Sequence, residues 1–191
     1  AAFGPHATDT VSPELWKRIA EAAEREGLPI HAHVGQSLEE LERCQERHGC
    51  TPVGLLKRSG VLGADASMLL VHAMYVTGED LSELSPDRHF LGLCPSSAIQ
   101  FGFPCDYPSW HAAGLRVCLG SDAACSNDSM NVQQEMRSLA GGAVFGVHSS
   151  PEARRFVETG SVEDARSVQA TRNEILKRSS PLNDPAVLLD T

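Results

Sequence analysis

The chain has 191 residues, a formal net charge of −9 and a hydrophobic content of 41%. This length is enough for one domain with a sizeable core, and the acidic balance argues against binding to nucleic acid, whose phosphates attract basic surfaces. No run of about 18 apolar residues is present, and the N-terminal segment AAFGPHATDT has neither the basic nor the apolar region of a signal peptide. We therefore expect a soluble, cytoplasmic protein with no membrane partner.

The first half of the chain alternates helical and apolar segments. A helix is predicted over residues 12–27, because Ser12 suits the N-cap and Pro13 suits the first helical position. A second helix is predicted over residues 37–49, which begin with the serine and glutamate spacing of a capping box. Shorter helices are predicted over residues 51–60, 77–85 and 106–114.

Apolar runs of strand length lie between these helices. They are LPIHAHV (28–34), SMLLVHAM (67–74), HFLGLCP (89–95) and LRVCLGSD (115–122). Apolar strands joined by helical crossovers indicate a parallel sheet buried on both faces, either doubly wound or closed into a barrel. Beyond residue 128 the sequence becomes helical, and we expect these last helices to pack on the same core.

Polar residues gather where the apolar runs end, which is the edge at which α/β folds bind ligands. His72, taken alone, is more often a hydrogen-bonded core residue than a metal ligand. Asp122 follows a buried strand, where a carboxylate needs a donor or a metal, although it also suits an N-cap. His31 and His33 face the same side of a regular strand, as a two-histidine metal site requires. Four histidines on polar segments are predicted to be solvated: His48, His89, His111 and His148.

The six cysteines are spread over apolar and loop segments, and no two form a CxxC pair. This distribution favours free thiols in a reducing compartment over a disulfide framework or a thiolate zinc site. We assign the cysteines no chemistry.

Five segments, taken in order, resemble the second half of a metal-dependent amidohydrolase, in the branch with cytosine, guanine and adenosylhomocysteine deaminases and triazine hydrolases. They are GPHATDTVSPEL, LPIHAHVGQSLEELER, GVLGADASMLLVHAMYVTGEDLSEL, LCPSSAIQFGF and AGLRVCLGSDAACSNDSMNVQQEMR. The resemblance implies an α/β fold that is part of a (β/α)8 TIM-type barrel, with strands four to eight at residues 1–6, 28–33, 67–72, 88–94 and 115–122. On this basis residues 1–191 are a fragment of one domain, with barrel elements in 1–128 and C-terminal helices in 129–191.

The same resemblance implies roles for individual residues. His33 matches a metal ligand, and His31 matches a non-ligand. His72 matches the histidine that contacts the metal site or holds the attacking water, and Asp122 matches the aspartate that binds the metal and accepts a proton from that water. The residues expected to contact substrate are His6, Gln36 and Ser97.

Spacing excludes HAH as the first-strand H-x-H pair of such a barrel. Seven more units of roughly 30 residues would have to fit into the 89 residues from His33 to Asp122. We therefore expect a fragment without strands one to three, which alone holds metal weakly and is inactive.

The implied reaction of the intact enzyme is hydrolysis of a non-peptide C–N bond in a small heterocycle. A divalent metal lowers the pKa of bound water from about 15.7 to about 7. Imidazole and carboxylate ligands suit zinc, with iron(II) as an alternative. Asp122 would take the proton of the water and pass it to the leaving group, while His72 would orient the hydroxide. The expected partner is a small-molecule substrate, and a homo-oligomer is left open.

Departures from the family's pattern leave the substrate open. Gln36 stands where the deaminases have a glutamate that protonates the ring nitrogen, and an amide cannot give and take that proton. Leu93 and Ala98 replace the histidine and asparagine of the pattern H-C-P-x-S-N. The alternatives are a C–Cl hydrolase of the triazine type, a family member that has lost catalysis and serves as a binding subunit, and, apart from the resemblance, a small doubly wound α/β binding domain.

Overall fold

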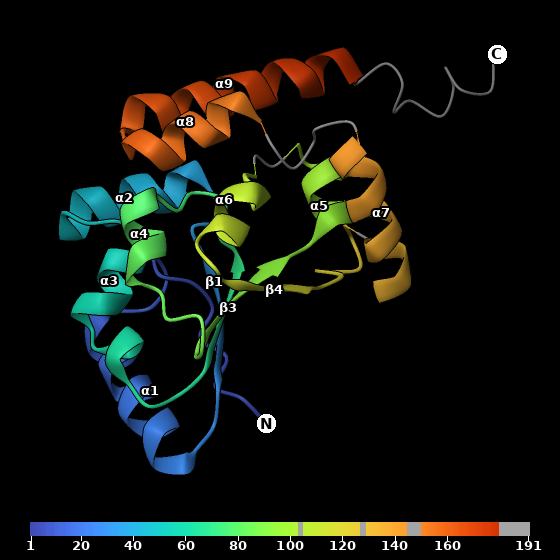
Figure 1. Cartoon of the computed structure of the whole chain (residues 1–191). Helices are drawn as coiled ribbons and strands as arrows, with labels where there is room; N and C mark the ends of the chain where they lie inside the picture. The colour runs from blue at the N-terminus through green and yellow to red at the C-terminus, as the bar shows by residue number, and fades with distance from the viewer. Residues whose placement is uncertain (103–104, 127–128, 145–149, 180–191) are drawn as a thin grey trace.

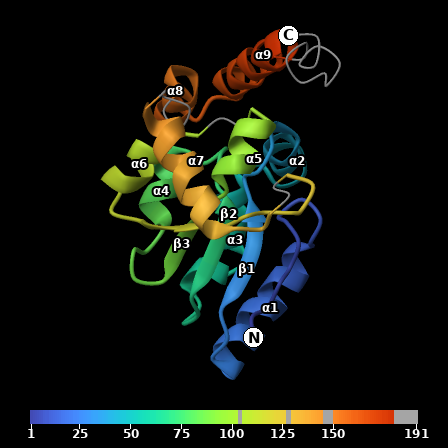
Figure 2. The ribbon, with the colours of Figure 1, turned by 90° about the vertical axis from the view of Figure 1, so that its right-hand side faces the viewer.

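The computed structural model describes residues 1–102, 105–126, 129–144 and 150–179. Its centre is one parallel sheet in the order β1-β2-β3-β4 (Figures 1 and 2). The strands are β1 (Ile30–Val34), β2 (Met68–His72), β3 (His89–Leu93) and β4 (Arg116–Leu119). Each strand lies within one of the predicted apolar runs, so the prediction of parallel strands joined by helices is confirmed.

The N-terminal segment continues the sheet beside β1. Phe3 and Ala7 form parallel bridges with Ile30 and His33. The His33 backbone N–H donates to the His6 carbonyl at 3.0 Å. The strand predicted over residues 1–6 is therefore present as isolated bridges rather than as a continuous strand.

Helices connect the strands and follow the last of them. They are α1 (Pro13–Glu26), α2 (Leu38–His48), α3 (Pro52–Arg58), η1 (Val61–Gly63), α4 (Gly78–Glu83), α5 (Pro95–Gln100), α6 (Tyr107–Ala112), α7 (Val132–Val144), α8 (Pro151–Thr159) and α9 (Val162–Ser179). The sequence did not predict η1 and α5, which are short and begin without a side-chain cap.

Side-chain caps fix the starts of the predicted helices. The hydroxyls of Ser12 and Ser37 accept hydrogen bonds from backbone N–H groups in the first turns of α1 and α2. The capping box predicted for α2 is only half formed, because the Glu40 carboxylate accepts from the Gln36 N–H instead of from Ser37. A complete capping box begins α4.

The sheet is covered by helices on one face. In β1, Ile30, Ala32 and Val34 are buried, and Figure 1 shows α1, α3 and α4 along this side of the sheet. The alternate residues His31 and His33 are exposed and half-buried on the other face. The expected burial of both faces holds only for β3, because the four described strands form an open sheet whose second face is not covered. The alternate residues of β1 and β2 are exposed or half-buried, and no residue of β4 is buried.

The C-terminal helices α8 and α9 lie beyond the carboxyl ends of the strands (Figures 1 and 2). Tyr75, in the loop after β2, packs its ring against Phe156 of α8 at a centroid distance of 5.8 Å. Its hydroxyl donates to Gln169 of α9 at 3.1 Å. Across the described ranges we find no helix with both the length and the apolar character needed to span a bilayer.

Candidate active site

The structure brings together the residues at the carboxyl ends of β1 and β2. His33 lies near the end of β1, and His72 is the last residue of β2. Their imidazole rings are stacked, with centroids 5.3 Å apart and planes 13° from parallel. The two rings therefore present nitrogens to the same region of the strand edge.

A backbone contact fixes the orientation of His33. Its Nδ1 lies 3.0 Å from the carbonyl oxygen of His6. Because a carbonyl only accepts, Nδ1 carries the proton of the neutral ring and Nε2 keeps its lone pair. This arrangement is the usual outer support of a metal-binding histidine.

His6 lies at the rim of the same group. Its ring meets His33 edge to face at a centroid distance of 5.2 Å, and its Nδ1 pairs with the hydroxyl of Thr10 at 3.0 Å. His31, by contrast, is exposed. Of the two histidines of HAH, it is His33 that makes the ring contacts to His6 and His72.

Burial controls the protonation of His72. Removal from water lowers the pKa of this imidazole to about 4; the nearby Asp122 carboxylate opposes the shift and His33 adds to it. The ring is consequently neutral near pH 7, as a metal ligand or general base must be.

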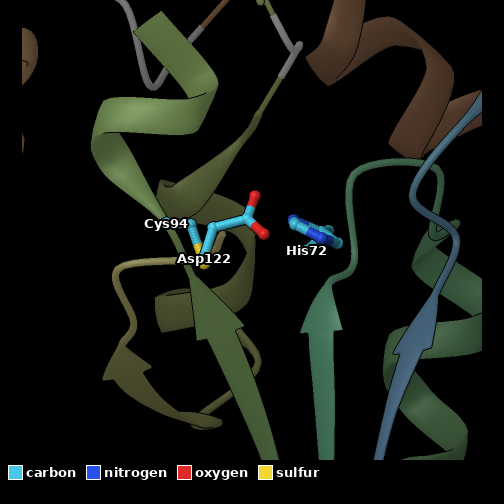
Figure 3. A group of neighbouring side chains, drawn as sticks. All are labelled: His72, Cys94 and Asp122. Carbon is cyan, nitrogen blue, oxygen red and sulfur yellow. The ribbon is translucent and has the colours of Figure 1, made fainter. Parts of the chain in front are cut away.

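Asp122 follows β4 and points its carboxylate toward His72 (Figure 3). One carboxylate oxygen accepts from the Ser97 hydroxyl at 2.6 Å, and the other accepts from the Ala123 N–H at 2.7 Å. Each oxygen retains a lone pair for another partner. Ser97 is only 1% exposed, so the structure places it against Asp122 rather than on a surface open to substrate.

Left-handed backbone conformations turn the chain sharply at these strand ends. His72 has φ of 74° and Asp122 has φ of 58°. Such values cost a non-glycine residue energy, and they cluster at functional sites where the surrounding structure enforces them. Gly35 also has a positive φ, and a Cβ there would lie 3.1 Å from the Tyr75 carbonyl oxygen. The loops after β1 and β2 therefore touch each other closely.

Gln36 lies half-buried in the loop after β1. Its backbone N–H donates to the Glu40 carboxylate at 2.8 Å, and the Thr8 hydroxyl donates to the same carboxylate. Glu40 is 1% exposed, and burial raises its pKa above the usual range, although its hydrogen bonds oppose the shift. Glu40 thus ties α2 to the loop that carries Gln36 and to the N-terminal segment, a role that the sequence did not predict.

Cys94 is the second residue that sequence reasoning missed. It follows β3, is buried, and lies beside Asp122 (Figure 3). Its Sγ, a ring nitrogen of His72 and a carboxylate oxygen of Asp122 lie within 4.8 Å of one another. Burial raises the pKa of this thiol to about 12. The only signal in the sequence was its position at the end of an apolar run, which the other site residues share.

The solvation predicted for the remaining histidines holds only in part. His89 is buried, and its Nδ1 accepts from the Ser85 N–H at 2.8 Å, so this prediction is wrong. The reason is that the polar turn before β3 folds back over the ring. His48 is half-buried and His111 is exposed, whereas His148 lies outside the described residues.

A groove of about 750 Å³ lies elsewhere, among α2, α3, α4 and α8, and shares no residue with this centre. Two of its charged side chains are paired with each other, since Lys57 lies 2.7 Å from Glu83, and the Asp80 carboxylate accepts from the Thr51 hydroxyl at 2.5 Å. Because this groove contains no histidine, the metal-binding chemistry points to the strand edge.

Residues 1–162 match the model of the amidohydrolase family. The chain belongs to the amidohydrolase family. This membership agrees with the resemblance of the five sequence segments, and it removes the alternative of an unrelated doubly wound binding domain.

Several relatives with curated names are deaminases. A 5-methylthioadenosine/S-adenosylhomocysteine deaminase from Pelotomaculum thermopropionicum is 35% identical over 141 residues, which cover 73% of this chain and 32% of the relative. A 5′-deoxyadenosine deaminase from Methanospirillum hungatei is 29% identical over 142 residues, which cover 73% of this chain and 31% of the relative. The chain thus spans about a third of the length of these relatives.

Solved amidohydrolase structures share the fold. An adenosine deaminase from Xanthomonas campestris with bound zinc matches with a TM-score of 0.67 at 23% identity, over 80% of this chain and 35% of that one. Atrazine chlorohydrolase from Arthrobacter aurescens, complexed with zinc, matches with a TM-score of 0.61 at 23% identity, over 70% of this chain and 29% of that one. The expected α/β fold, part of a TIM-type barrel, is confirmed.

Proposed function

We propose that the protein to which this chain belongs is a metal-dependent hydrolase that removes an amino group from a small heterocycle. The observation that carries the proposal is the convergence of His33, His72 and Asp122 at one strand edge of an amidohydrolase chain. The deaminase names of the relatives support the choice of a C–N bond.

The donor set fits a divalent metal. His33 offers Nε2 because Nδ1 is held by a carbonyl, and Asp122 keeps lone pairs on both oxygens. Neutral imidazole and carboxylate suit zinc, with iron(II) as the second choice. The metal would supply a water whose pKa is lowered from about 15.7 toward 7.

Each residue of the centre has its own role in the proposed reaction. Asp122 accepts the proton of the attacking water and returns it to the leaving amine, since its carboxylate faces the centre. The Ser97 hydroxyl holds one carboxylate oxygen and so fixes the direction of the other. His72, neutral because it is buried, orients the water and donates to the developing oxyanion. We expect His6 and Gln36 to contact the substrate ring, because His6 meets the ring of His33 and Gln36 follows β1 at the same strand edge.

Gln36 favours a second candidate, the hydrolysis of a C–Cl bond. Loss of ammonia needs a proton on the leaving amine as well as on the ring nitrogen, and an amide at position 36 cannot supply the ring proton. Loss of chloride needs one proton fewer, because chloride leaves without a proton. A chlorinated ring is therefore a substrate for which Gln36 is a smaller handicap.

The test is to load the full-length protein with zinc or iron(II) and to measure ammonia release from aminopurine nucleosides and chloride release from a chlorotriazine. Ammonia release that is lost in Asp122→Asn and retained in the exposed control Asp87→Asn would support deamination. Gln36→Glu should raise ammonia release more than chloride release. A metal-loaded protein that releases neither product would refute hydrolysis and favour a binding subunit.

A further inference from the structure

The centre contains a sulfur atom, that of Cys94, which the proposed reaction does not use. Cys94, His72 and Asp122 come from the ends of β3 and β2 and from the loop after β4, and Figure 3 shows them together. Their ligand atoms lie within 4.8 Å of one another. Two of the three, His72 and Asp122, are also central to the proposed hydrolysis.

The Cys94 sulfur is held in place by the turn that carries Asp122. A Cβ on Gly120 would lie 3.3 Å from Sγ, so the glycine leaves room for the sulfur at this point. The Asp122 backbone N–H donates to the same sulfur. Cys94 therefore differs from a buried core thiol such as Cys105, because it sits against a carboxylate and an imidazole that can bind the same ion.

The distances between the three ligand atoms are close to those between the ligand atoms of a bound cation. Zinc bonds of about 2.0 to 2.3 Å place neighbouring ligand atoms roughly 3.3 to 3.7 Å apart. The observed limit of 4.8 Å thus requires a movement of about one ångström, which small side-chain rotations provide. A thiolate selects soft, thiophilic cations, whereas imidazole and carboxylate alone do not.

We propose that Cys94, His72 and Asp122 form a cation site for thiophilic divalent metals that overlaps the proposed catalytic centre. The proposal rests on the proposed function for its consequence, which is inhibition: an ion bound here takes Asp122 and His72 away from the attacking water. Binding deprotonates the thiol, so each ion taken up releases one proton from Cys94.

Cadmium is the probe, because its bond to a thiolate gives a charge-transfer band in the near ultraviolet. The starting protein is the full-length enzyme with Cys118→Ser and Cys125→Ser, which removes the two exposed thiols of the described residues. Cadmium should produce the band and inhibit hydrolysis in this protein. Cys94→Ser should abolish the band and the accompanying proton release. It should also weaken inhibition about 100-fold or more, since loss of even an outer partner of a ligand weakens metal binding about 10- to 100-fold.

Cys44→Ser is the matched control, because Cys44 is also a buried thiol with a raised pKa but bonds to Thr8. It should keep the band. Cadmium-edge X-ray absorption of the protein with Cys94 intact should show a sulfur neighbour, and this measurement does not depend on whether Cys94→Ser folds. A band that persists in Cys94→Ser, or the absence of a sulfur neighbour, would overturn the site. A Cys94-dependent band in a protein without hydrolase activity would support the site and refute the proposed reaction.

Discussion

Glu40 provides the sharpest test of how the loop beside the centre is held. Its buried carboxylate accepts hydrogen bonds from the Gln36 N–H and from the Thr8 hydroxyl. Glu40→Ala leaves the buried Thr8 hydroxyl and the half-buried Gln36 N–H without this acceptor, and each such loss costs about 1 to 3 kcal/mol. We therefore expect the free energy of unfolding to fall by about 2 to 6 kcal/mol.

The exposed neighbour Glu39 is the control, and Glu39→Ala should change the free energy of unfolding by less than about 0.5 kcal/mol. Urea unfolding followed by circular dichroism measures both variants. Equal effects of the two substitutions would show that the carboxylate of Glu40 does not hold the loop.

The same residue predicts a dependence on pH. Burial raises the pKa of Glu40 above 4.5, so the folded state binds this proton more tightly than the unfolded state. Its protonation favours folding at low pH, and this contribution is lost as the pH rises through the raised pKa. Glu40→Gln has no such titration and keeps an acceptor for the Gln36 N–H. The stability of Glu40→Gln relative to the unsubstituted protein should therefore increase with pH across this range, and a constant difference would contradict the argument.

Three further predictions concern Gly35, Ser97 and His89. Gly35→Ala should lower the melting temperature more than Gly27→Ala, as measured by thermal unfolding. Both glycines have φ of 62°, but only a Cβ at Gly35 would meet the Tyr75 carbonyl. Ser97→Ala should lower kcat about 10- to 100-fold with little change in KM, the equivalent of about 1.5 to 3 kcal/mol for a hydrogen bond to a charge. Ser138 of α7, whose hydroxyl pairs with Ser96 rather than with Asp122, is the control, and Ser138→Ala should leave kcat unchanged. Burial lowers the pKa of His89 below 6.5, so its contribution to stability should be lost as the pH falls below about 6.5. The free energy of unfolding should therefore fall less steeply with decreasing pH in His89→Gln. An equal slope in the two proteins would contradict this.

The sequence was sufficient to predict the order and type of the main elements. Apolar runs marked β1 to β4, and serine or proline at the starts marked α1 and α2. Each of these signals lies within one short stretch of sequence, so it is visible without knowledge of the tertiary structure. The element α5 was missed because its N-cap residue is a cysteine that makes no capping bond.

The site was predictable only as far as the position of residues at strand ends. Their positions at the ends of apolar runs made His33, His72 and Asp122 candidates, and only the resemblance of the five segments to the amidohydrolases implied a metal site. Cys94 meets the same criterion but looked like a core residue, since its contact with Asp122 depends on the turn at Gly120. Glu40 looked like half of a capping box, and only the fold shows that its carboxylate turns toward Thr8 from a distant part of the chain.

The two unusual features of the centre lie on opposite sides of the stacked histidines. On the β1 side, Gln36 is held through its backbone by Glu40. On the side of β3 and β4, Asp122 is held by Ser97 and neighbours Cys94. The described hydrogen bonds give the two sides no common partner, so substitutions on them should be nearly additive. Residue 36 can therefore change without altering the metal preference proposed for the centre, and a Gln36→Glu, Cys94→Ser double variant should combine the two single effects.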